Sequence, residues 1–416
     1  MDHCQGAMSI ARRRPGRVTA ESAAAGGGAG RDTLRLAILH RVCTEYRLEL
    51  FRRLSETNGL RVRLFIGEDL PKSKVRTNVD LSSLDFCKCR TTFIRLERRL
   101  IPVHRRLYQA LRQFDPDVIL CEGESHLYGC LTAIAYRSRH PQVGLVHWSL
   151  GGMPGAPHHG RSLSTRAKYA LQRRFDTFLA YSSYGKQRLI ALGHHPERIF
   201  VATNVSCVEK HLAIARTLPE SRREARLKLR LPSRFTLIYA GSMDRNKRLG
   251  VLLKAAAALS ENCNLLLVGA GTMLERLKAQ AMHLRHTVCF PGRVGRELPW
   301  YYRASDVLVL PGRGGVVISE AMAYGVPAIT HQADGTEYDL VRHGETGVLL
   351  PDGSPEALRC AIEFVRSDPD RAARWGRRAQ ELIEAKFTMG HMAKQIIAAV
   401  EAARRARRQP LCEPTW

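Results

Sequence analysis

Short apolar stretches alternate with amphipathic ones along this chain, and the alternation begins a second time near its middle. Residues 34–39 are mostly apolar, and in residues 46–54 the apolar side chains fall on one side of a helix. Strands that alternate with helices form a parallel sheet with helices on both faces. The rhythm breaks at the highly charged residues 217–231 and then restarts. The sequence therefore predicts an α/β fold with two doubly wound parallel-sheet units.

The expected elements fall into two runs. In the first run we expect strands at 34–39, 61–66, 117–121, 143–146 and 177–180, and helices at 46–54, 100–113, 125–138 and 165–174. In the second run we expect strands at 235–239, 264–268, 287–290, 307–310, 327–330 and 347–349. The helices of that run are expected at 250–259, 273–284, 317–325, 354–366, 370–386 and 389–405. Ligands of such sheets bind at the carboxyl ends of the strands.

The length of the chain also favours two domains. With 416 residues, the chain exceeds the roughly 250–300 residues that one hydrophobic core organises. We predict an N-terminal domain at 34–215, a C-terminal domain at 216–390, and a last helix with a tail at 391–416 that crosses back to the first domain. Residues 1–33 are rich in Arg, Ala and Gly and have almost no large apolar side chains, which is typical of an unstructured leader.

The charge balance is strongly basic, with 65 Lys and Arg against 39 Asp and Glu and a net charge of +26. One interpretation is an arginine-rich proteome with a basic surface. The other is attraction to an anionic partner, for which a membrane with acidic lipids or a phosphorylated substrate fits better than DNA. The sequence contains no helix-turn-helix, zinc-finger or interleaved basic–aromatic pattern, so we expect no nucleic-acid partner.

Several features predict a cytoplasmic protein. The longest apolar runs, such as residues 264–270, are far too short to cross a bilayer, and no segment has the apolar core of a signal peptide. The 11 cysteines are scattered without a Cys-x-x-Cys pair or a Cys/His ligand set, which indicates reduced thiols. We expect neither a metal ion nor a resident cofactor.

The segment at 310–330 carries the strongest functional signal, because it gives a strand, a glycine-rich loop, a helix and a second strand in order. Gly312, Gly314 and Gly315 let backbone approach a ligand closely, and the free N–H groups at the start of the following helix favour phosphate. Glu320 lies about one turn into that helix, where a carboxylate could accept hydrogen bonds from two sugar hydroxyls. The alternative is a tight turn followed by a solvated glutamate, and composition alone leaves both open.

Residues 320–329, Glu-Ala-Met-Ala-Tyr-Gly-Val-Pro-Ala-Ile, resemble the second half of a known nucleotide-binding signature. It belongs to the retaining glycosyltransferases of family 4, also called glycosyl transferases group 1, and the match points to the polysaccharide-biosynthesis type. The resemblance also includes residues 239–247, 267–271, 288–306 and 344–351, so it extends over most of 232–390 and is weak before it. It implies the GT-B fold, in which two Rossmann-like domains face each other across a cleft.

The resemblance also implies roles in binding the sugar donor. Glu320 is similar to the carboxylate that binds the ribose hydroxyls, and Lys247 to the lysine that meets the diphosphate, whose charge grows as the glycosidic bond breaks. Gly315 and Val316 would offer backbone N–H groups to the phosphates. The family holds the base by backbone contacts after a strand end, which here falls at Gly292, Arg293 and Val294. An ordinary strand-to-loop turn is the alternative for those three residues.

Two departures from the family pattern concern the same site. The first glutamate of the signature, which lies near the hydroxyls of the donor sugar, falls at Gly312. The arginine that supports the diphosphate falls at Ser242, directly after Gly241. Arg313 or Arg245 could supply the missing cation. The departures fit either a weakened homologue or a subgroup with a different solution, because a Pro-Gly-x-Gly-Gly loop also resembles a variant among polysaccharide-building members.

In the first half of the chain, His147 directly follows the predicted strand at 143–146. Members of the family commonly carry a histidine at a strand end here, next to the reacting sugar. We therefore predict that His147 acts in catalysis by positioning or hydrogen bonding, together with Lys247 and Glu320. The alternative is a partly buried structural histidine.

The candidate acceptor residues follow two other strands. Glu122 and Glu124 come after the strand at 117–121, and either carboxylate could take a proton from the acceptor hydroxyl, bind hydroxyls, or merely be solvated. Arg41, Tyr46 and Arg47 follow the first strand and are candidates for contact with the acceptor or its phosphate. For these three residues the alternative is solvation at the start of a helix.

The sequence thus predicts a glycosyltransferase that moves a sugar from a nucleoside-diphosphate sugar to a glycan or lipid-linked acceptor. By resemblance the transfer retains the anomeric configuration, needs no metal, and serves the synthesis of a bacterial cell-surface polysaccharide. The basic charge is consistent with peripheral contact at the inner face of the plasma membrane. The rival hypotheses are a catalytically inactive GT-B homologue that binds a glycan or a partner, a nucleotide-sugar epimerase, and, from charge alone, a nucleic-acid-binding protein.

Overall fold

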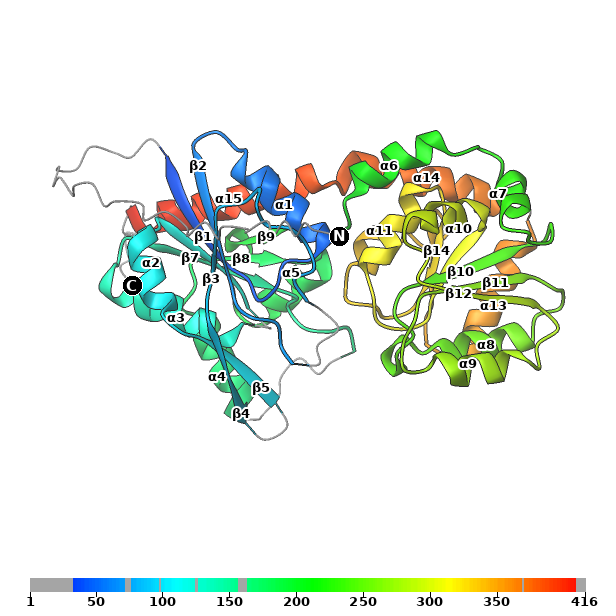
Figure 1. Cartoon of the computed structure of the whole chain (residues 1–416), viewed down its shortest axis with the longest axis horizontal. Coiled ribbons are helices and arrows are strands. Elements are labelled where there is room, and N and C mark those ends of the chain that lie inside the picture. The colour runs from blue at the N-terminus through cyan, green and yellow to red at the C-terminus, as the bar shows by residue number, and fades with distance from the viewer. Residues whose placement is uncertain are drawn as a thin grey trace, which may run out of the picture. The chain divides into compact units, whose positions relative to one another are not determined.

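The computed structural model describes residues 33–71, 76–96, 99–123, 126–155, 163–368 and 370–408. The predicted leader therefore lies outside the described residues except for Thr33, as does the end of the predicted tail. The described chain contains two parallel sheets covered by helices, which confirms the predicted α/β fold class (Figure 1). Within the described residues, none of the helices combines the length and the apolar character that crossing a membrane requires.

The first sheet has seven strands in the order β3-β2-β1-β6-β7-β8-β9. Its strands are β1 (Leu34–Leu39), β2 (Leu60–Ile66), β3 (Phe86–Lys88), β6 (Val118–Glu122), β7 (Gly144–Ser149), β8 (Thr177–Ala180) and β9 (Ile199–Val201). The central strands β7 and β8 are buried along their whole length because helices cover both faces. Its helices are α1 (Glu45–Ser55), α2 (Leu107–Phe114), α3 (Leu127–Arg139), α4 (Leu163–Gln172), α5 (Ser183–Ala191) and the short η1 (Pro196–Arg198).

An antiparallel hairpin made of β4 (Thr91–Leu96) and β5 (Arg99–His104) stands apart from the two sheets. Phe93 pairs with Pro102 in its register. The prediction of a helix over 100–113 was therefore wrong at its start, and α2 begins only at Leu107. The physical reason is Pro102, which lacks a backbone N–H and would clash with the preceding turn inside a helix.

The second sheet has six parallel strands in the order β12-β11-β10-β13-β14-β15. They are β10 (Thr236–Ala240), β11 (Asn264–Val268), β12 (Thr287–Gly292), β13 (Val307–Leu310), β14 (Ala328–Thr330) and β15 (Gly347–Leu349). The helices are α6 (Val208–Thr217), α7 (Arg222–Lys228), η2 (Arg245–Lys247), α8 (Leu249–Ala257), α9 (Leu274–Ala281), η3 (Gly295–Glu297), α10 (Leu298–Ala304), α11 (Val316–Ala323), α12 (Glu337–Leu340), α13 (Pro355–Arg366) and α14 (Arg371–Lys386). Figure 1 shows α8, α9 and α13 on one face of this sheet and α10, α11 and α14 on the other.

The last helix, α15 (Met389–Arg408), returns to the first sheet, as the sequence predicts. Its apolar side chains, including Met392 and Ile396, belong to the same buried cluster as β1 and α1. The hydroxyl of Thr177 in β8 donates to the carbonyl oxygen of Ala399 at 2.9 Å. Gly144 in β7 allows this close packing, because a Cβ atom there would lie 2.8 Å from the backbone of Ala403.

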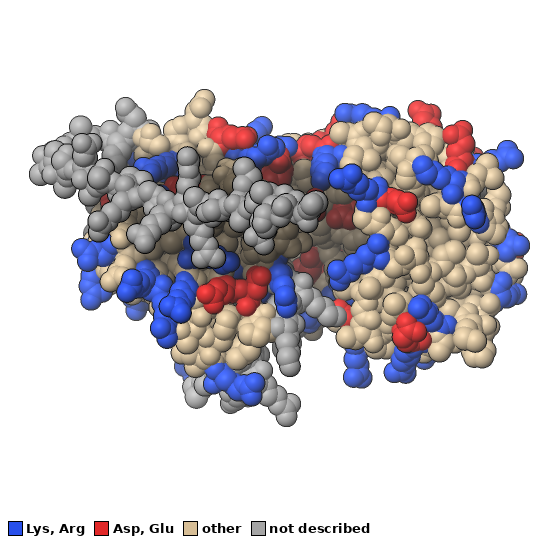
Figure 2. Space-filling model, in the orientation of Figure 1, with Lys and Arg blue, Asp and Glu red and all other residues tan. Residues whose placement is uncertain are grey.

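Charge is distributed widely over the surface. Figure 2 shows Lys and Arg side chains scattered over the visible face, with Asp and Glu side chains between them. The excess of positive charge is therefore spread across this face rather than gathered in one patch.

Candidate active site

Three neighbouring strands of the second sheet bring the main candidate residues together. In the sheet order, β10, β13 and β14 are adjacent, and all run parallel, so their carboxyl ends meet at one edge. The loop after β10 leads to Lys247, the loop after β13 is the glycine-rich segment 311–315, and the loop after β14 covers 331–336. This edge is the place where parallel α/β sheets bind their ligands.

Lys247 is held against the glycine-rich loop. It ends η2, and its Nζ donates to the carbonyl oxygen of Arg313 at 2.5 Å. Burial lowers the pKa of this amine, while the negative charges of Asp334 and Asp244 act in the opposite direction. A half-buried ammonium group beside a glycine-rich loop is suited to a phosphate ligand, which can replace a neutral carbonyl as its partner.

Gly312 has a clear packing reason to lack a side chain. A Cβ atom there would lie 2.6 Å from the carbonyl oxygen of Asn246 and 2.7 Å from the carbonyl carbon of Lys247. The backbone N–H of Arg313 also donates to the carbonyl oxygen of Asn246 at 3.1 Å. The loop after β13 thus packs directly on η2, and this arrangement leaves no room for the glutamate of the family signature.

The amino end of α11 faces the same loop. Gly315 is the residue that precedes the helix, and as a glycine it has no side chain that could cap the free N–H groups there. Gly314 has a φ of 145°, a backbone conformation that favours glycine. Because an uncapped helix start carries partial positive charge and free donors, the N–H groups at Gly315 and Val316 suit an anion. The structure therefore brings Lys247 and these predicted phosphate donors together.

Glu320 lies one turn into α11, with its carboxylate directed at an aromatic pair. Its Oε2 accepts a hydrogen bond from the hydroxyl of Tyr302 at 3.1 Å, and Tyr302 stacks on Tyr324 with ring centroids 5.3 Å apart. Burial raises the pKa of Glu320 to about 7, although the hydrogen bond from Tyr302 opposes that rise. The Glu320 side chain is half-buried, so part of it stays reachable for a ligand.

The other predicted donor residues lie along the same sheet edge. Gly241 follows β10 with a φ of 142°, and Arg245 and Arg313 are exposed. Gly292 ends β12, two strands from β10, and is followed by Arg293 and Val294. In place of a side-chain cation at position 242, the carbonyl oxygen of Ser242 accepts the hydroxyl hydrogen of Tyr239 at 2.7 Å.

His147 lies inside the first sheet domain. Its side chain is in β7 with only 1% of its surface exposed, and its ring meets that of Phe175 edge-on at a centroid distance of 4.9 Å. Gly123 makes room for the imidazole, because a Cβ atom there would lie 2.0 Å from its Cε1. In this arrangement the ring is part of the core beneath the sheet edge, so its role in catalysis stays a prediction.

Glu122 supports the loop after β1. Its Oε2 accepts the backbone N–H of Arg41 at 3.0 Å and lies 3.4 Å from Nδ1 of His40. The carboxylate therefore organises the segment that carries the other predicted acceptor residues. Glu124, the second predicted carboxylate, lies outside the described residues.

Arg47 is enclosed by aromatic rings instead of solvent. Only 2% of it is exposed, and its guanidinium lies 4.3 Å from the ring centroid of Trp148, 5.0 Å from that of Tyr46 and 5.4 Å from that of Tyr181. Its Nη2 donates to the side-chain oxygen of Asn204 at 3.0 Å. Cation–π contacts of this kind fix Arg47 within the domain, whereas Tyr46 and Arg41 keep partly exposed positions.

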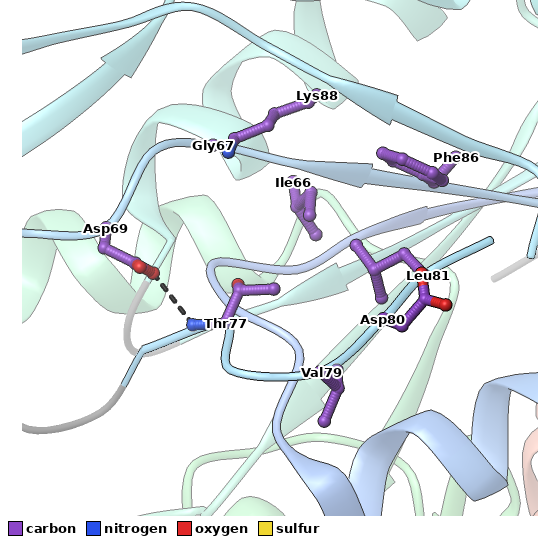
Figure 3. Close-up of a pocket in the computed structure, with 9 residues that line it drawn as sticks. All are labelled: Ile66, Gly67, Asp69, Thr77, Val79, Asp80, Leu81, Phe86 and Lys88. Atoms are coloured by element: carbon purple, nitrogen blue, oxygen red, sulfur yellow. Dashed lines mark hydrogen bonds between the residues drawn. The ribbon is translucent and has the colours of Figure 1, made fainter.

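Sequence reasoning missed a cavity at the carboxyl ends of β2 and β3 (Figure 3). Its volume is about 260 Å³, and Phe86 and Lys88 border it from β3. Two further lining residues are bonded to each other, because the carboxylate of Asp69 accepts the backbone N–H of Thr77 at 2.9 Å. The remaining lining residues are Ile66, Gly67, Val79, Asp80 and Leu81. They are spread over a long connection, so no motif marks them in the sequence.

Comparison with known proteins agrees with this fold and site. Residues 221–382 match the family model described as Glycosyl transferases group 1. Residues 45–205 match the model described as Glycosyltransferase Family 4. The two matches fall on the two sheet domains in the order that the resemblance implies.

The named relatives of this chain are also glycosyltransferases. A GDP-mannose-dependent alpha-mannosyltransferase of Mycobacterium tuberculosis is 32% identical over 66% of this chain and 71% of its own length. A GDP-mannose-dependent alpha-(1-6)-phosphatidylinositol monomannoside mannosyltransferase of the same species is 28% identical over 43% of this chain and 50% of its own length. The crystal structure of Anabaena HepE in complex with UDP superposes with a TM-score of 0.70 at 17% identity, over 89% of this chain and all of HepE.

The fold and the family matches together define a glycosyltransferase of the GT-B class. The chain belongs to the glycosyl transferases group 1 family, and it is an enzyme that transfers glycosyl groups. These findings confirm the predicted GT-B fold, membership of the predicted family, and the prediction of a glycosyltransferase.

Proposed function

We propose that the protein transfers a sugar from a nucleoside-diphosphate sugar to a glycan or lipid-linked acceptor, with retention of anomeric configuration, in the synthesis of a bacterial cell-surface polysaccharide. The observation that carries the proposal is the meeting of Lys247 with the glycine-rich loop and the uncapped start of α11. Two M. tuberculosis relatives are named as GDP-mannose-dependent, and HepE was crystallised with UDP, which supports a nucleotide-sugar donor.

The chemistry follows from where charge develops. The bond between the anomeric carbon and the phosphate oxygen breaks, and a new bond forms between that carbon and the acceptor oxygen. The acceptor proton passes to the departing phosphate oxygen, so no dedicated protein base is needed. Lys247 and the N–H groups at the start of α11 stabilise the growing negative charge on the diphosphate, and no metal ion is required for that task.

In this proposal, the nucleoside and the acceptor contact different residues. Glu320 accepts hydrogen bonds from ribose hydroxyls in its ionised form. The cavity bordered by Phe86 and Lys88 offers an aromatic face, carboxylates and an ammonium group, which together suit the hydroxyl groups of a sugar acceptor. It lies at the carboxyl edge of the first sheet, where such domains bind their ligands.

We also propose peripheral contact with an anionic membrane from the cytoplasmic side. Ile94 and Leu100 of the hairpin are 52% and 36% exposed, and Leu127 and Leu131 of α3 are 47% and 50% exposed. Strand β5 lies against α3, so these apolar side chains occupy adjoining elements. Exposed apolar side chains together with a net charge of +26 suit a surface of acidic lipids.

Gly312 and Ser242 replace two residues of the family pattern, so the rival hypothesis of a non-catalytic homologue is tested together with the donor. One experiment separates the two. The purified chain is titrated calorimetrically with GDP-mannose, UDP-glucose and ADP-glucose, and hydrolysis of the bound donor is followed. Slow donor hydrolysis, in which water takes the place of the acceptor, supports the enzyme. Binding with neither hydrolysis nor transfer to an added glycan acceptor supports the non-catalytic homologue. Absence of binding to all three contradicts the choice of donor.

A further inference from the structure

The packing at Gly312 leaves the donor site without the carboxylate that the family signature would place there. That carboxylate lies near the hydroxyls of the donor sugar in the resembling proteins. In this chain the backbone of η2 occupies the space that a side chain at position 312 would need. If a carboxylate binds the sugar in this chain, another part of the chain supplies it.

Asp334 approaches the same place from the neighbouring loop. It follows β14, which pairs with β13. A Cβ atom built on Gly315 would lie 2.2 Å from Oδ1 and 2.5 Å from Oδ2 of Asp334, so the carboxylate touches the residue that precedes α11. Its charge also acts on Lys247 and favours the protonated amine. Asp334 is thus the carboxylate that the fold brings to the phosphate-binding loop.

The loop around Asp334 is held in place by hydrogen bonds. The carboxylate of Glu337 accepts the backbone N–H groups of Ala333, Asp334 and Gly335 at 2.9, 3.2 and 2.7 Å. Glu337 is 1% exposed, so this turn is anchored within the domain. The loop therefore places the Asp334 side chain with little freedom, which is what a specific ligand contact requires.

The hydrogen bonds of Asp334 leave one oxygen for a ligand. Oδ1 accepts the hydroxyl hydrogen of Thr336 at 2.6 Å and its backbone N–H at 3.2 Å. Among the residues that the structure describes, none donates a hydrogen bond to Oδ2. Asp334 is half-buried rather than enclosed. An ionised carboxylate with one oxygen fixed and the other available can accept hydrogen bonds from hydroxyl groups.

We propose that Asp334 binds the hydroxyl groups of the donor sugar and replaces the carboxylate that is missing at position 312. This inference rests on the proposed function. A carboxylate repels the diphosphate itself, so within the donor it suits the neutral sugar rather than the phosphates. The partial positive charge at the start of α11 stabilises the carboxylate at this position.

The test compares donors with and without the sugar. Calorimetric titrations of the full chain use GDP with GDP-mannose and UDP with UDP-glucose. For the pair that binds, Asp334→Asn is expected to weaken nucleotide-sugar binding about tenfold, the effect of losing a hydrogen bond to a charged group. The affinity for the nucleoside diphosphate alone is expected to stay within about twofold or to rise, because a negative charge is removed.

Asp334→Asn keeps an oxygen that can accept from Thr336, so it preserves the loop. Thr336→Val is the control for the loop, because it removes the hydroxyl that donates to Asp334 but leaves the carboxylate in place. Melting temperatures of both variants show whether the loop is intact. The control is expected to retain the preference for the nucleotide-sugar over the nucleoside diphosphate.

Two results would overturn the inference while the proposed function stands. One is an unchanged affinity of Asp334→Asn for the nucleotide-sugar. The other is an equal loss for the nucleotide-sugar and the nucleoside diphosphate, which would assign Asp334 to the loop or the phosphates. If the unaltered chain binds neither of these pairs, nor ADP and ADP-glucose, the proposed donor is wrong, and the role of Asp334 falls with it.

Discussion

The ammonium group of Lys247 donates a hydrogen bond to the carbonyl oxygen of Arg313, so the turn after β10 is joined to the glycine-rich loop after β13. These two segments are 66 residues apart in the sequence. The bond keeps a cation next to the free N–H groups of α11 before any ligand arrives. Pre-placed charge of this kind needs no rearrangement when negative charge develops on a diphosphate.

Replacement of Lys247 by Met should therefore impair turnover more than folding. The side chain keeps most of its length but loses its charge and its donors. We expect donor turnover to fall by about 100- to 1000-fold, in the range found when one electrostatic donor is removed from an active site. Lys254→Met on α8 is the matched control, because Lys254 is exposed and lies outside the loops at the sheet edge. Equal rates for the two variants would contradict the role of Lys247.

Gly312→Ala should disturb the contact between the two loops. The added methyl group would overlap the backbone of Asn246 and Lys247, and overpacking of this kind costs about 1–3 kcal/mol. We expect a lower melting temperature and weaker binding of nucleoside diphosphates. Gly250→Ala in α8 is the control, because the nearest atom to its Cβ would lie 3.9 Å away. A Gly312→Ala variant with unaltered stability and binding would show that the loop has another conformation.

The raised pKa of Glu320 predicts a pH-dependent stability. Its pKa rises from 4.5 to about 7, so between these values the folded state binds more protons than the unfolded state. The free energy of unfolding must then decrease as pH rises through this window. Glu320→Gln removes the effect, so the variant should gain on the order of 2 kcal/mol relative to the parent chain between pH 4.5 and 7.5. Urea unfolding at both pH values measures the difference, and a constant difference would refute the raised pKa.

The sequence predicts those parts of the fold and site that local pattern determines. Most strands of the two sheets follow from apolar runs, although the short edge strands β3 and β9 were not predicted. The loop at Gly314 and Gly315 follows from its glycines and the helix after them. The hairpin was missed because its apolar side chains also fit a helix, and only Pro102 argues against one. Asp334 was missed because its meeting with Gly315 depends on how β13 and β14 pair. Such contacts arise from tertiary packing and leave no spacing signal.

The last prediction concerns the proposed membrane surface. If the face formed by the hairpin and α3 contacts acidic lipids, replacing Leu127 and Leu131 together by Ser should reduce flotation of the full chain with vesicles that contain phosphatidylglycerol. Both leucines are about half exposed and lie one turn apart on α3, so the change removes apolar area without opening the core. Binding of the parent chain should also fall as salt is added, because part of the attraction is electrostatic.

Leu227→Ser on α7, which is 65% exposed in the other sheet domain, is the control and should float like the parent chain. Equal flotation of the double variant and the control would exclude this face as the membrane contact. Equal flotation of the parent chain with vesicles of neutral lipid would exclude a preference for acidic lipid.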